Sequence, residues 1–107
     1  MGGQGEIDDV YALVREAIVE RRCVDAIFGG CRRQLCPHAI GTRDGQPRAL
    51  FFQFGGGSSR GLAAGGDWRC LPLDGLSAVS VHDGPWRTRA HSEPQHCIDD
   101  VDLEIGP

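Results

Sequence analysis

The N-terminal part of the chain carries one apolar stripe at helical spacing. Its members recur every three or four residues: Ile7, Val10, Tyr11, Val14, Ala17 and Ile18, with Leu13 widening the stripe. Acidic residues (Glu6, Asp8, Asp9) stand at its start and Arg21 and Arg22 at its end, where a helix dipole favours each charge. The pattern predicts one amphipathic helix from Glu6, preceded by a Gly-rich start at residues 1–5 that we expect to be disordered.

After this helix the pattern changes to short strands separated by turn signals. Residues 23–28 and 31–40 flank Gly29-Gly30, which predicts a hairpin turn. In the second strand one face is expected to carry Arg33, Leu35, Pro37 and Ala39, and the other Arg32, Gln34, Cys36, His38 and Ile40. Because Pro37 cannot donate a ladder hydrogen bond, this strand is predicted to be an edge, or to bulge or bend there.

The most apolar stretch of the chain is residues 48–54, which contain three of the four Phe residues. A run of apolar residues without turn formers predicts a strand covered on both faces, and we expect this strand to be the most buried. Gln53 is the polar interruption within it. An Asp44-Gly45 turn precedes the strand, and a Gly-rich loop at residues 55–66 follows it.

Two further strands, at residues 68–73 and 76–82, are joined by Asp74-Gly75. Residues 86–95 are polar and predicted to be irregular, whereas Val101, Leu103 and Ile105 alternate with acidic residues as in a half-buried strand. A helix followed by five short strands predicts an α+β fold, in which the N-terminal helix packs on a small five-stranded antiparallel barrel of the Sm or SH3 kind. A chain of 107 residues indicates a single domain over residues 6–107.

Composition limits the classes of partner and compartment. The net charge of −4 provides no overall basic field, so any contact with nucleic acid has to be a local patch. All eleven basic residues are Arg, for which a genome rich in G and C is the simplest explanation. The five Cys are an odd number and no export signal or membrane span is visible, so we expect buried or reduced thiols rather than disulfides, and a cytoplasmic location.

The order of these features resembles the WYL domain family over roughly residues 10–81. The resemblance rests on Ala17-Ile18, Val24, Phe28, Arg33, Pro37, Asp44-Gly45, Leu50-Phe51-Phe52, Arg60, Trp68-Arg69 and the closing run from Leu73 to Val79. It is greatest with small bacterial members in which Pro37-His38, Gly41, Gln53, Gly56, Ser58 and Trp68-Arg69 recur in this order. WYL domains have Sm-like or SH3-like barrels and sense ligands or nucleic acids. The resemblance therefore implies a non-enzymatic regulatory module.

The candidate binding site is a pocket for a small anionic or nucleotide-like ligand, made by Arg33, His38, Gln53, Ser58, Arg60, Trp68 and Arg69. Arg forks, Ser hydroxyls and loop N–H groups suit phosphate or carboxylate, and Trp68 offers a stacking face for a base. The alternative is that Arg33 and Arg69 are solvated or paired with acidic residues and that Trp68 belongs to the core. Gln53 has two equal interpretations: ligand contact, or an internal amide that holds the Gly-rich loop.

Metal binding and catalysis have weaker support. Cys36 and His38 lie two residues apart and zinc prefers Cys and His, but no Cys-x-x-Cys pair is present. No catalytic motif fixes a nucleophile and base, and Gly55-Gly56-Gly57 is not followed by the Gly-Lys-Ser/Thr of a phosphate-binding loop. We therefore expect no enzyme activity, cofactor or metal.

The alternative function is a protein-interaction module that uses a barrel edge for homo- or hetero-association. The predicted edges are residues 31–40 and 101–105. The acidic residues Asp99, Asp100, Asp102 and Glu104 indicate that the second of these edges is guarded against pairing. A homodimer is thus a possible assembly.

Overall fold

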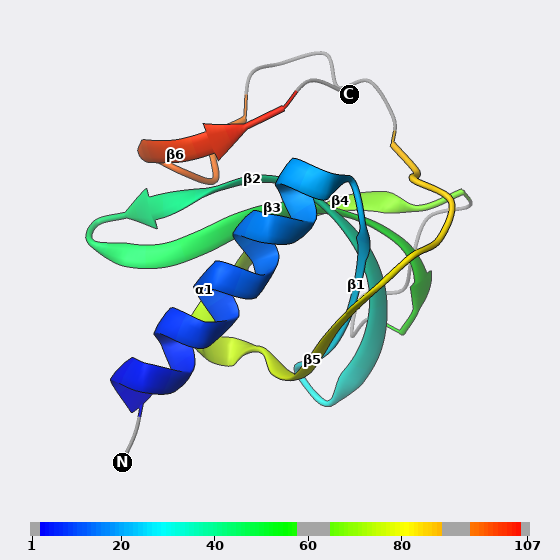
Figure 1. Ribbon diagram of the computed structural model, residues 1–107, viewed down its shortest axis with the longest axis horizontal. Coiled ribbons are helices and arrows are strands. Elements are labelled where there is room, and N and C mark those ends of the chain that lie inside the picture. The colour runs from blue at the N-terminus through cyan, green and yellow to red at the C-terminus, as the bar shows by residue number, and fades with distance from the viewer. Residues whose placement is uncertain (1–2, 58–64, 89–94, 106–107) are drawn as a thin grey trace.

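The computed structural model of the protein describes residues 3–57, 65–88 and 95–105 (Figure 1). Its elements are, in order, α1 (Gly3–Glu20), β1 (Cys23–Phe28), β2 (Cys31–Arg43), β3 (Gln46–Gly56), β4 (Asp67–Pro72), the short 3-10 helix η1 (Leu73–Gly75), β5 (Ser77–His82) and β6 (Asp100–Glu104). All strand pairs are antiparallel. The predicted α+β class is confirmed.

The sheet has six strands and is not closed into a barrel. Its order is β4-β3-β2-β1-β5, and β6 pairs with β2 beside this path. Within the described residues, the two outermost strands β4 and β5 do not pair with each other. The predicted five-stranded closed barrel is therefore wrong in strand number and in closure. The extra strand has a physical cause: β1 pairs with only the first part of β2, and the edge left on residues 39–42 pairs with β6.

Strand β2 carries a bulge at His38. Pro37 lies opposite Phe51 and Ala39 opposite Leu50, so the ladder shifts by one residue between them. The predicted bulge near Pro37 is confirmed. The predicted edge position is wrong, because β2 pairs with β3 on one side and with β1 and β6 on the other.

The bulge also reverses the alternation of side chains along β2. Leu35 and Ile40 lie in the same core cluster, whereas Ala39 belongs to a cluster on the other face of the sheet. The expected grouping of Leu35 with Ala39, and of Cys36 with Ile40, is therefore wrong beyond Pro37. A strand keeps its period of two only while no residue is inserted into the ladder.

The main core lies between α1 and the sheet (Figure 1). Its buried members are Val14, Ala17, Ile18, Val24, Ala26, Leu35, Ile40, Ala49, Phe51, Leu71, Leu73 and Leu76. Leu13, which was expected to widen the helical stripe, is 40% exposed. Helix α1 begins at Gly3, earlier than predicted, while residues 1–2 of the expected disordered start lie outside the described residues. No helix in the described part of the chain has the length and apolarity to cross a membrane.

The other face of the sheet carries a second apolar layer. Because successive residues of a strand point to opposite faces, Phe52 points away from the main core that holds Phe51. A thiol–aromatic cluster forms there from Cys23, Cys36, Phe52, Phe54, Trp68 and Trp86. Next to it lies a smaller cluster of Ala39, Leu50, Cys97 and Ile98. The segments that follow β5 thus contribute side chains to this face.

Strand β6 is also held to the helix. Tyr11 Oη and Arg15 Nε donate hydrogen bonds of 2.7 and 3.0 Å to Asp102 Oδ2. These two bonds lower the pKa of Asp102, and burial together with the bond to Asp102 raises the pKa of Tyr11 to about 12. The acidic character of this strand, interpreted from the sequence as protection of an edge, therefore includes one carboxylate that joins β6 to α1.

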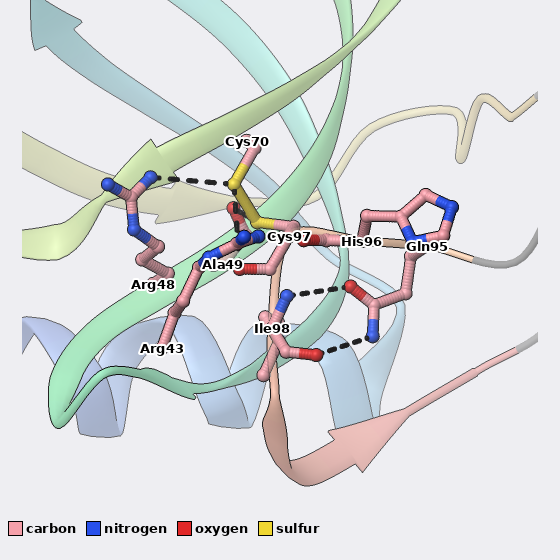
Figure 2. The surroundings of a disulfide bond; sticks show 8 residues. All are labelled: Arg43, Arg48, Ala49, Cys70, Gln95, His96, Cys97 and Ile98. Carbon is pink, nitrogen blue, oxygen red and sulfur yellow. Dashed lines mark hydrogen bonds between the residues drawn. A yellow bond between two sulfur atoms is a disulfide. The ribbon is translucent and has the colours of Figure 1, made fainter.

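A disulfide between Cys70 of β4 and Cys97 joins residues 27 positions apart (Figure 2). Near it, Gln95 accepts from Ile98 N and donates to Ile98 O at 2.8 and 3.0 Å. Arg43 donates to the carbonyl of His96. The expectation of reduced thiols is wrong for this pair, whereas Cys23, Cys31 and Cys36 are free. Disulfides are uncommon in the cytosol, and the predicted cytoplasmic location stays a prediction.

Replacing both Cys70 and Cys97 by Ser should lower the free energy of unfolding by roughly 3–4 kcal/mol, the chain-entropy value for a loop of this size. Urea unfolding of the double variant and the parent checks this. Cys31→Ser is the matched control, since it removes a thiol that the disulfide does not use. A reducing agent should bring the parent to the stability of the double variant. A loss below about 1 kcal/mol would show that the bond does not limit the unfolded chain.

Candidate functional site

Three of the predicted site residues meet at neighbouring strands of the sheet. Arg33 comes from β2, Gln53 from β3 and Arg69 from β4. The Oε1 atom of Gln53 accepts hydrogen bonds from Arg33 Nη1 at 3.2 Å and from Arg69 Nε at 3.4 Å. We call these residues the arginine–glutamine cluster. Two guanidinium groups thus converge on a single neutral oxygen.

Arg33 is a buried cation, with only 4% of its surface exposed. Its Nε donates to the carbonyl of Phe28 at 3.2 Å, and its Cζ lies 5.2 Å from the centroid of the Phe28 ring. The β1–β2 hairpin brings Phe28 close to Arg33. Its two-residue turn requires positive φ angles, and Gly29 and Gly30 have φ values of +60° and +77°. No carboxylate of the described residues forms an ion pair with Arg33. A buried charge without a counter-charge is costly.

Arg69 is the more accessible of the two cations, with 19% of its side chain exposed. Its Nη1 lies 3.6 Å from Oδ2 of Asp67, which is two residues away on the same strand face. Asp67 also pairs with Gln53 across the β3–β4 ladder. Within the described residues, the cluster thus contains two guanidinium groups and one half-exposed carboxylate, which is paired with Arg69.

The amide of Gln53 holds the first part of the Gly-rich segment. Its Nε2 donates to the carbonyls of Gly55 at 3.0 Å and Gly57 at 2.9 Å. A further bond runs from Gly57 N to Arg32 O at 2.9 Å. Gly56 between them has φ +87°, and a Cβ there would collide with the Arg32 carbonyl, so glycine is required. The internal-amide interpretation of Gln53 is confirmed.

The other predicted site residues do not join this cluster. Ser58 and Arg60 lie outside the described residues. His38 lies on the other face, where Nδ1 donates to the carbonyl of Cys36 and Nε2 accepts from the Thr88 hydroxyl, both at 2.9 Å. The centroid of the Trp68 ring lies 4.8 Å from that of the His38 ring and 5.3 Å from that of the Phe52 ring. The predicted single pocket is therefore wrong for His38 and Trp68, because bulge and strand alternation send them to the opposite side.

Sequence reasoning missed two contributors to the cluster, Phe28 and Asp67. Phe28 supplies a carbonyl and a ring face to Arg33, and its only signal was its place just before the Gly29-Gly30 turn. Asp67 is the acidic partner of Arg69 within the described residues, and its place beside Trp68-Arg69 was visible but unused. The internal-amide interpretation of Gln53 covered the Gly-rich loop, but it did not identify the accepting carbonyls as those of Gly55 and Gly57.

The structure gives no support to the weaker zinc and nucleophile interpretations. In the described part of the chain, no three His, Cys, Asp or Glu side chains gather where they could hold a metal ion. Both ring nitrogens of His38 already have hydrogen-bond partners. Burial is the main cause that raises the pKa of the Cys36 thiol to about 12, so the nucleophilic thiolate is scarce at neutral pH.

Comparison of the chain with family models, with curated proteins and with solved structures finds no match. The resemblance to WYL domains therefore stays a prediction from motifs.

Gln53→Ala should lower the free energy of unfolding by about 2–4 kcal/mol, because it leaves the buried Arg33 and two Gly carbonyls without their amide partner. Chemical denaturation measures the change. Gln46→Ala is the matched control, since it removes an exposed amide at the first residue of β3. Equal stability of the two variants would contradict the structural role of Gln53.

Proposed function

We propose that this protein is a non-enzymatic regulatory module that binds a small anionic or nucleotide-like ligand at the arginine–glutamine cluster. The observation that carries the proposal is the convergence of Arg33 and Arg69 on the neutral Gln53 oxygen, with Asp67 as the one described counter-charge. An anion would be attracted by the two guanidinium groups. Guanidinium groups favour phosphate and carboxylate, which accept two parallel hydrogen bonds.

The two cations have different roles in this proposal. Arg69 is partly exposed, so its guanidinium group is the one that contacts the ligand. Arg33 is buried and already donates to Phe28 O and Gln53 Oε1. It therefore does not contact the ligand but attracts it as a fixed positive charge. A nucleotide, rather than a simple anion, is supported by the resemblance to WYL domains alone.

A thermal-shift titration tests the proposal with pyrophosphate, AMP and a short oligonucleotide. A ligand at a hundredfold excess over its Kd should add about 2.7 kcal/mol, which raises the Tm of a domain of this size by roughly 10 °C or more. Arg69→Ala should abolish the shift while leaving the Tm of the free protein nearly unchanged. High salt should weaken the shift, because the interaction is ionic.

Arg32→Ala is the matched control, because it removes the same charge from the neighbouring, exposed position of β2. It should keep the shift. Two outcomes would overturn the proposal: no shift from any of the three probes, or a shift that Arg69→Ala and Arg32→Ala weaken equally, which indicates unspecific attraction.

The open edge of β5 favours a second candidate function, a protein-interaction module. Strand β5 ends the strand order, and within the described residues no strand pairs with its outer side. Its sequence from Ser77 to His82 contains no Asp, Glu, Lys, Arg or Pro, the residues that usually guard an exposed edge. The two edges predicted from the sequence are less suitable for pairing, because β2 is paired on both sides and β6 carries several acidic residues. Strand β5 is therefore the edge proposed here. Under this function two copies pair through their β5 edges.

Ser80→Lys should convert such a dimer to a monomer, because it places a charge at the centre of the exposed edge without removing a buried contact. Light scattering after size-exclusion chromatography measures the mass. Ala12→Lys, which adds the same charge at an exposed position of α1, is the control and should remain dimeric. A monomeric parent protein at its highest soluble concentration would reject pairing between copies.

A further inference from the structure

Cys23 and Cys36 stand face to face in the thiol–aromatic cluster. The β1–β2 ladder pairs Val24 with Leu35, so the next pair in the same register is Cys23 with Cys36. Both residues are fully buried and belong to the same cluster, which places both side chains on one face of the sheet. They are free thiols, unlike Cys70 and Cys97.

This placement meets the distance requirement of a disulfide. Directly opposed residues of an antiparallel pair have Cα atoms about 4.5–5.5 Å apart, and disulfides span Cα distances of about 4.4–6.8 Å. The Cys70–Cys97 bond of this protein has a Cα distance of 5.5 Å. Cys23 also contributes to the raised pKa of Cys36, as expected for neighbouring thiols. The Cα spacing expected from this register therefore suits a disulfide.

Segment 83–88 contacts both thiols. Cys23 Sγ donates to the carbonyl of Pro85 at 3.7 Å, and Arg87 N donates to Cys36 Sγ at 3.3 Å. These residues belong to segment 83–88, which has no regular secondary structure and whose members other than Trp86 are exposed. Outside the cluster, an exposed ion pair of 3.0 Å between Arg22 and Asp83 fixes one end. Segments with few buried contacts open locally at low free-energy cost.

We propose that Cys23 and Cys36 form a redox-active dithiol, a site of reversible disulfide formation by exchange with a small-molecule disulfide of the glutathione class. Opening of segment 83–88 admits the oxidant. The Cys23 thiolate attacks one sulfur of the oxidant and displaces the first thiol. The same opening exposes Cys36 to water and removes the burial that raises its pKa, so that its thiolate attacks the mixed disulfide and displaces the second thiol. The two cysteines lose two protons and two electrons, and the oxidant becomes two thiols.

Oxidation changes the contacts of the covering segment. A disulfide sulfur carries no hydrogen, so Cys23 no longer donates to Pro85 O. Both Trp residues of the protein, Trp68 and Trp86, pack in the same cluster and report the change. This site lies on the face of the sheet away from the arginine–glutamine cluster, and the proposal does not depend on the proposed ligand binding.

Equilibration of the folded protein in buffers of graded reduced and oxidised glutathione tests the proposal. The experiment uses the Cys31→Ser variant as its parent protein. Trypsin leaves Cys31 in the same peptide as Cys23, so a link from that peptide could otherwise come from either cysteine. In this parent, oxidation should link peptide 23–32 to peptide 34–43 with loss of two hydrogens. Tryptophan fluorescence should change over the same range of redox buffer and return on reduction.

Cys36→Ala in the same background is the matched variant and should show neither the link nor the fluorescence transition. Cys23→Ala removes the other sulfur and serves equally if Cys36→Ala does not fold. The proposal is overturned if both thiols of the parent remain alkylatable after equilibration in the most oxidising buffer. A stable glutathione adduct on one cysteine without the link would also overturn it.

Discussion

Strand β2 pairs with three other strands, and one bulge within it decides which of its side chains reach each face of the sheet. Leu35 and Ile40 enter the main core on either side of the shift, while Cys36 and Ala39 serve the opposite face. Without the bulge at His38, a period of two would place Ala39 in the main core and Ile40 on the other face. The packing of α1 on one side and of Cys97 and Ile98 on the other therefore depends on this single inserted residue.

The arginine–glutamine cluster has a structural role centred on Gln53. Gln53 satisfies two glycine carbonyls and two guanidinium groups, so the amide contributes to the fold whether or not a ligand is present. A glutamate at this position would neutralise the cations but could not donate to Gly55 and Gly57. The neutral amide thus keeps the backbone of the Gly-rich segment in place and adds no negative charge beside Arg33 and Arg69.

Local patterns predicted the elements well, and long-range placement less well. Strand 23–28, the Gly29-Gly30 turn and the bulge near Pro37 follow from turn chemistry and side-chain periodicity, which act over a few residues. The pairing of β6 with β2 and the Cys70–Cys97 disulfide depend on where the tail docks, which no local pattern contains. In the candidate site, Arg33, Gln53 and Arg69 were grouped correctly because they lie on adjacent strands. His38 and Trp68 were misplaced because side-chain parity was not followed through the bulge and across β4.

The two faces of the sheet are joined by β4, where neighbouring residues belong to different sites. Trp68 packs against Phe52 in the thiol–aromatic cluster, and Arg69 donates to Gln53 in the arginine–glutamine cluster. Phe52 and Gln53 are likewise neighbours on β3, and each lies on the same face as its partner on β4. A shift of this strand pair that repacks the Trp68 ring must therefore also move the Arg69 guanidinium. The thiols of Cys23 on β1 and Cys36 on β2 pack in the same cluster as Phe52 and Trp68, so both proposed sites contact the β3–β4 pair.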